Sequence, residues 1–188
     1  MFTLQKALLI SGAAIFIFAT LGMFYQEAIM VTLFTLFIPG PLFGLIISIF
    51  KKAALLQRVL FFVSACLIYF FTLYLIDIKN IDYKLAPTRI LIASVLSAVL
   101  VQVLFDIIFR SKMIFLDTVL RPSALGFVSS IVSAIATFFF NGISSTTGWL
   151  TIPLWMGLFS IFPLWYFLFG QHLIRSGKIS NIYEFNMI

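Results

Sequence analysis

The sequence predicts an all-α integral membrane protein, a polytopic bundle of six transmembrane helices with both termini on the cytoplasmic side. Of its 188 residues, 63% are hydrophobic and only 10% are charged, whereas a soluble domain carries about 25% charged residues because its surface faces water. The charges are separated by apolar runs long enough to cross a bilayer, which takes about 20 residues. Lys and Arg gather in alternate loops, as the positive-inside bias requires.

The charges set the boundaries of the first four predicted spans, because a charge is costly in hydrocarbon. The uncharged run between Lys6 and Glu27 is 20 residues long. It is too long for the apolar region of a signal peptide, and we expect a retained helix. The first four spans are predicted at about residues 7–24, 28–50, 59–76 and 90–109.

The last two spans come from one stretch without Asp, Glu, Lys or Arg. This stretch, Pro122–Ile174, has 53 residues, far more than one crossing needs. Its turn-rich segment NGISSTTG (Asn141–Gly148) divides it. We therefore predict a fifth span at about 123–140 and a sixth at about 149–169.

Orientation follows from the Lys and Arg residues of the loops. One side holds nine: Lys6, Lys51, Lys52, Arg58, Arg110, Lys112, Arg121, Arg175 and Lys178; the other holds three: Lys79, Lys84 and Arg89. The richer side is predicted to be cytoplasmic, in a bacterial inner membrane. The same bias explains the net charge of +6, so we expect the lipid bilayer as a partner and no direct contact with nucleic acid.

The fourth span carries a candidate polar site. Gln102, Asp106 and Arg110 follow at steps of four, which puts them on one face of a helix, with Asp106 and Arg110 close enough to pair. An ionisable residue inside a span suggests gating, ion coupling or ligand binding. Alternatively, Asp106 lies one turn from the cytoplasmic end and only neutralises Arg110.

Residues 110–121 (RSKMIFLDTVLR) have basic ends and an apolar middle. Such a pattern predicts an interfacial helix on the inner leaflet, and an ordinary positive-inside loop is the alternative. With Lys112 and Arg121, the residues Lys51, Lys52 and Arg58 would form a cytoplasmic face for a protein partner or anionic lipid.

The second span contains a Pro-Gly break at Pro39, Gly40, Pro41 and Gly44. Two prolines remove backbone donors and kink a helix, and freed carbonyls at membrane depth must face protein or water. The break is therefore expected to face the bundle interior, either as a structural kink or as part of a ligand site or pore.

The fifth span carries two adjacent rows of small residues. Gly126, Ser130 and Ala134 form one row, and Ser129, Ser133 and Thr137 form the other. Small residues at this spacing let helices approach closely. The pattern leaves open whether this packing occurs within one chain or between chains.

The sequence lacks the groups that most enzyme classes need. It has one cysteine, Cys66, and one histidine, His172, so no metal site or cofactor is expected. No base or second carboxylate accompanies Asp106 in the spans. We therefore expect a non-enzymatic membrane subunit that self-associates, docks a cytosolic partner, or does both, in a sensing, anchoring or immunity role. The alternative is a small transporter or channel for an apolar solute or small ion, using the Pro-Gly break and Asp106.

Overall fold

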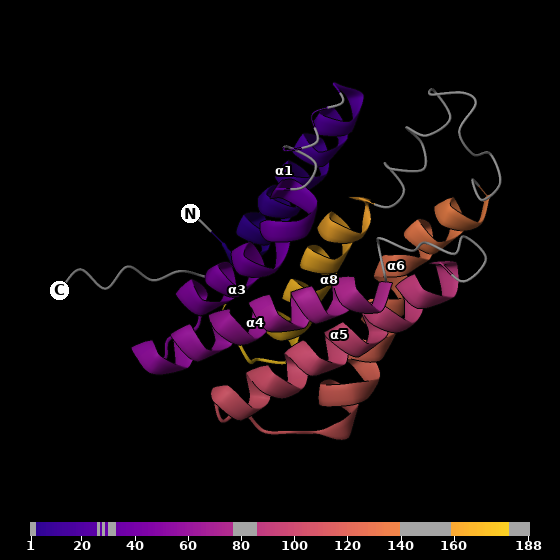
Figure 1. Ribbon diagram of the computed structural model, residues 1–188. Coiled ribbons are helices and arrows are strands. Elements are labelled where there is room, and N and C mark those ends of the chain that lie inside the picture. The colour runs from indigo at the N-terminus through magenta and orange to yellow at the C-terminus, as the bar shows by residue number, and fades with distance from the viewer. Residues whose placement is uncertain are drawn as a thin grey trace.

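The computed structural model describes residues 3–25, 27, 29, 33–76, 86–139 and 159–180, and its regular elements in these ranges are all helical (Figure 1). In chain order they are α1 (Leu4–Phe24), the π-helical turn η1 (Leu33–Phe37), α3 (Pro39–Phe50), α4 (Leu55–Ile76), α5 (Ala86–Ile108), the π-helical turn η2 (Leu116–Leu120), α6 (Arg121–Phe139) and α8 (Ile161–Arg175). Four helical stretches are long and apolar enough to cross a membrane: Leu4–Phe24, Leu55–Ile76, Pro87–Ile108 and Leu116–Phe138. The all-helical class is therefore confirmed, with four helices suited to a membrane.

These four helices match four predicted spans, but each begins earlier than the charges indicate. Lys6, Arg58 and Arg89 lie inside the first two turns of α1, α4 and α5. Long basic side chains can keep their charged heads in water while their stems cover apolar surface. A helix can therefore start before a Lys or Arg that marks the edge of the hydrocarbon.

The predicted second span, 28–50, is not a continuous α-helix where the structure describes it. The π-helical turn η1 precedes α3, which has 12 residues, and the Ile38 N–H bonds the carbonyl of Leu33 at 2.9 Å. Pro39 and Pro41 cannot donate, and a proline ring clashes with the carbonyl four residues earlier. The hydrogen bonds therefore change from the α-helical spacing of four residues to the π-helical spacing of five just before the prolines, a common response to such a disruption.

Residues 110–121 do not form a separate interfacial helix. Residues 111–114 are a non-helical connection, and η2 then runs directly into α6. The Arg121 N–H bonds the carbonyl of Leu116, so the widened turn again lies just before a proline, Pro122. The second half of the predicted interfacial segment, from Leu116 to Arg121, is therefore the first part of a membrane-length helix.

The predicted sixth span lies only partly within the described residues. The turn-rich segment 141–148 and residues 149–158 are outside them. The described part, α8, continues to Arg175, beyond the expected end at residue 169.

The helices pack antiparallel, so that their charged ends meet. Gly12 of α1 lies against Pro163 of α8, and Leu8 against Gly170; in Figure 1, α8 runs between α1 and α6, and both helices contact it. One end of the bundle therefore holds the starts of α1, α4 and α6 together with the ends of α3, α5 and α8. We call this the basic end: it includes η2 and residues 176–180.

The outer face of α4 is apolar along its length. One stripe of large apolar side chains is exposed along its length: Leu56, Leu60, Val63, Leu67, Phe71 and Tyr74. The spacing of three and four residues is that of one helical face. A continuous apolar face of this size is unfavourable in water and fits contact with lipid.

Candidate functional site at the basic end

Two polar side chains of α5 are withdrawn completely from solvent. Gln102 and Asp106 are 0% and 1% exposed, and the Gln102 Nε2 donates to Asp106 Oδ1 at 3.0 Å. Their spacing of four residues places them on one face, as predicted. Arg110 does not continue this face, because α5 ends at Ile108 and Arg110 is exposed with a positive φ of 51°.

Asp106 pairs with Lys178 instead of Arg110. The Lys178 Nζ lies 2.6 Å from both carboxylate oxygens, and the two side chains are only 8% and 0% exposed. Thr118 Oγ1 donates to Oδ2 at 2.9 Å. Three separate parts of the chain thus converge on one carboxylate: α5, η2 and the segment after α8.

The end of α8 positions Lys178. Gly177 adopts a left-handed conformation with φ 68°, and the Lys178 N–H bonds back to the carbonyl of Leu173 at 3.0 Å. Glycine terminates helices in this way because it lacks a Cβ. Ile179 then packs into the apolar core, so that the turn directs the Lys178 side chain inward.

A second lysine lies beside the ion pair. Lys51 Nζ donates to the Lys178 carbonyl at 2.6 Å and lies 5.4 and 5.7 Å from the ring centres of Phe105 and Phe109. Burial lowers the pKa of Lys51, Asp106 opposes this shift and Lys178 adds to it. The cluster therefore holds two basic groups for one carboxylate.

One acceptor in this cluster remains unsatisfied. Gln102 Oε1 is buried and has no hydrogen-bond partner among the residues that the structure describes. Most buried polar atoms in folded proteins have a partner, and an exception calls for an explanation. The unsatisfied oxygen belongs to the same amide whose nitrogen bonds Asp106.

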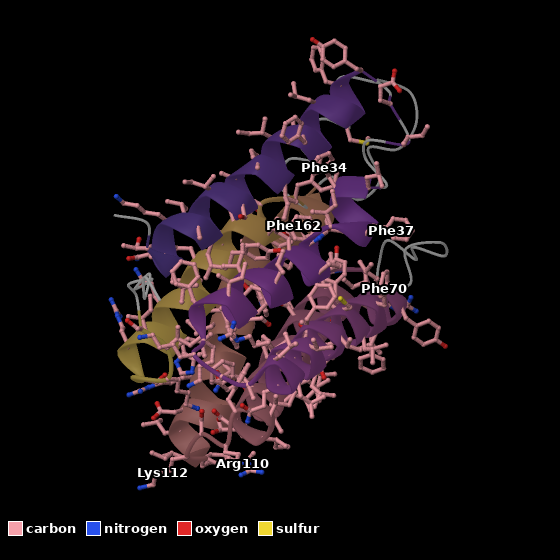
Figure 2. The ribbon with its side chains drawn as sticks, turned by 90° about the vertical axis from the view of Figure 1, so that its left-hand side faces the viewer. Phe34, Phe37, Phe70, Arg110, Lys112 and Phe162 are labelled. Atoms are coloured by element: carbon pink, nitrogen blue, oxygen red, sulfur yellow. The ribbon has the colours of Figure 1, made fainter. Side chains whose placement is uncertain are left out.

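The surface around this cluster is strongly basic. Within the described ranges, the basic end holds all nine predicted cytoplasmic cations, from Lys6 to Lys178, and two acidic residues, Asp106 and Asp117. Asp117 is paired with Arg121, so both carboxylates are already engaged. Figure 2 shows Arg110 and Lys112 at the bottom of the view, far from the labelled phenylalanines Phe34, Phe37, Phe70 and Phe162.

The Pro-Gly break is filled by protein. A Cβ on Gly40 would lie 2.4 Å from the Tyr69 Cβ, and one on Gly44 would lie 2.9 Å from the Ala65 Cβ. The Tyr166 hydroxyl donates to the carbonyl of Pro39. Of the two roles considered for this break, a packed kink between α3, α4 and α8 fits these contacts.

The small residues of α6 are buried within the chain, and Gly126 packs against α5. Ser94 Oγ donates to the Gly126 carbonyl at 2.8 Å, and a Cβ on Gly126 would lie 2.6 Å from the Ser94 carbonyl oxygen. The remaining members of the two rows are buried as well: Ser129, Ser130, Ser133, Ala134 and Thr137. These rows therefore serve the interior of the chain, and they offer little surface to a second copy.

Sequence reasoning did not identify Lys178 and Thr118 as parts of the site. Lys178 entered only the charge count, and Thr118 lies in the segment predicted as interfacial. They lie 72 and 12 residues from Asp106, and no local pattern links them to it. The one local signal is Gly177, a helix-ending residue that turns the next side chain back toward the bundle.

Comparison of the chain with protein-family models, with curated proteins and with solved structures found no match.

Proposed function

We propose that this protein is a non-enzymatic membrane subunit whose basic end docks an acidic cytosolic protein. The observation that carries this proposal is the charge of that end. Among the described residues, its nine Lys and Arg residues face two carboxylates, and both carboxylates are paired within the chain. The excess positive charge favours an acidic partner, and complementary charge speeds and orients such an encounter.

The proposed orientation places this end in the cytoplasm of a bacterium, with six spans and both termini inside. The alternating direction of the described helices supports it, because α1, α4 and α6 start at the basic end whereas α3, α5 and α8 finish there. The positive-inside bias is the reason for assigning the basic end to the cytoplasmic side. Self-association was also expected, but the small-residue rows that suggested it are buried within the chain.

The test is a binding measurement with charge-reversed protein. The tagged chain in lipid nanodiscs is used to isolate a cytosolic partner, and its affinity is then compared for wild type and for the double variant Arg110→Glu, Lys112→Glu. Both residues are exposed. We expect affinity to fall at least about tenfold, with a weaker dependence on salt.

Glu27→Lys provides the matched control, because Glu27 is exposed near the far end of α1. This variant should bind the partner as wild type does. Equal affinities for the charge-reversed and wild-type chains, or binding that salt does not weaken, would contradict the proposal.

A further inference from the structure

Four oxygens belong to three side chains that hydrogen bonds link inside the basic end. They are the two carboxylate oxygens of Asp106, the Thr118 hydroxyl oxygen that donates to one of them, and the unsatisfied Gln102 Oε1. Carboxylate, amide and hydroxyl oxygens are the ligands that hard cations prefer. At present the positive charge among them is the Lys178 ammonium, 2.6 Å from each carboxylate oxygen.

The Lys178 ammonium leaves part of this oxygen set unused. An ammonium has three donors in a fixed geometry, and none of them bonds Gln102 Oε1. A bare cation has no such directional limit, so it can be coordinated by every oxygen that reaches it. A fully buried acceptor without a donor is thus the feature that a cation would satisfy and the lysine does not.

The charge of the cluster selects the class of cation. A single carboxylate is neutralised by a single positive charge, as Lys178 shows. A divalent cation would leave a buried excess positive charge next to Lys51, which bonds the Lys178 carbonyl. Burying an unpaired charge is strongly unfavourable, so a monovalent ion fits and a divalent ion does not.

We propose that Asp106, Gln102 and Thr118 form a binding site for an alkali-metal cation, Na⁺ or K⁺, and that the Lys178 ammonium is its built-in competitor. This inference does not depend on the docking function. Lys178 lies in the short turn after α8, and its departure requires that this turn move and that Ile179 leave the apolar core. Cation binding and closure of this turn then exclude each other, which links the ion to the shape of the basic end.

Replacing Lys178 by Ala tests the site directly. The full chain in detergent is melted in NaCl, KCl or choline chloride at one ionic strength, since choline is too large for the site. We expect the melting temperature of Lys178→Ala to rise saturably with Na⁺ or K⁺, by about 3–6 °C at ten times the half-saturating concentration. Wild type should respond less, because its own ammonium competes.

Two variants separate a bound ion from a general salt effect. Asp106→Asn combined with Lys178→Ala removes the carboxylate and should lose the response, and Glu27→Gln removes an exposed carboxylate from the far end of the bundle and should show the same cation response as wild type. Folding of Lys178→Ala in Na⁺ or K⁺ but not in choline would support the site.

Three results would overturn the proposal. The first is the same melting temperature for Lys178→Ala in all three salts. The second is a melting temperature that follows pH and not the cation, because a proton would then neutralise Asp106. The third is failure of Lys178→Ala to fold in any salt while the double variant folds.

Discussion

The basic-end cluster and the contact between α5 and α6 are both polar and both buried, but they are built differently. In the α5–α6 contact at Gly126, hydroxyls bond backbone carbonyls of their own helix, as Ser129 and Ser130 do to Gly126. Only neutral groups are involved, and Ser94 reaches across to the other helix. In the cluster, by contrast, Asp106 and Lys178 join distant parts of the chain through charge.

This difference predicts how each region responds to mutation. A hydroxyl that bonds its own helix can be removed and leaves a carbonyl that the helix still satisfies. A charged partner that is removed leaves the opposite charge buried and uncompensated. We therefore expect mutations at the basic end to lower the free energy of unfolding by large amounts that are not additive. Mutations in the α5–α6 contact should lower it less, by an amount that depends on how closely the two helices can pack.

The largest effect is expected for Asp106→Ala. The Lys178 ammonium would remain almost buried without its carboxylate, and breaking such a pair costs about 3–5 kcal/mol. The free energy of unfolding, measured by denaturant titration in micelles, should fall by this amount. Adding Lys178→Ala to the same chain should recover much of the loss, and losses that simply add would contradict the charged cluster.

A smaller effect is expected for Gly126→Ala. The new Cβ would lie 2.6 Å from the Ser94 carbonyl oxygen and 2.9 Å from the Val95 Cα, so the backbones of α5 and α6 must separate. Overpacking of this kind costs about 1–3 kcal/mol, which the same denaturant titration measures.

Ser94→Ala is the matched control for that variant, because it removes one hydrogen bond and leaves the spacing unchanged. Its cost should be near 0.6 kcal/mol, the usual value for an interhelical hydrogen bond in a membrane protein. A larger loss for Ser94→Ala than for Gly126→Ala would show that the hydroxyl, and not close approach, holds the two helices together.

Most of the elements that were predicted correctly could be located from local features of the sequence. Four spans were located because apolar runs and the charges beside them are local features, and the shared face of Gln102 and Asp106 followed from helical periodicity. The break at Pro39 and Pro41 was also located, since proline acts on its own helix. The widened turns before these prolines and before Pro122 were not predicted, because the spacing of apolar residues does not report them.

The partners of these features could not be found in the same way. The spacing of four residues suggested Arg110 for Asp106, but the helix ends two residues earlier, at Ile108. The true partner, Lys178, is 72 residues away and is brought in by the antiparallel packing of α8. Likewise, the small residues of α6 were recognised, but their neighbour Ser94 is set by tertiary structure.

The central claim is that one end of the bundle gathers the charge and faces the cytoplasm. The direct test is cysteine labelling from each side of the membrane, with Cys66 replaced by Ala and one cysteine introduced at Lys112 or at Glu27, both exposed. With a membrane-impermeant maleimide, we predict that Lys112→Cys reacts only after the membrane is opened, whereas Glu27→Cys reacts in intact cells. Labelling of both cysteines from the same side, or the reverse pattern, would contradict the account.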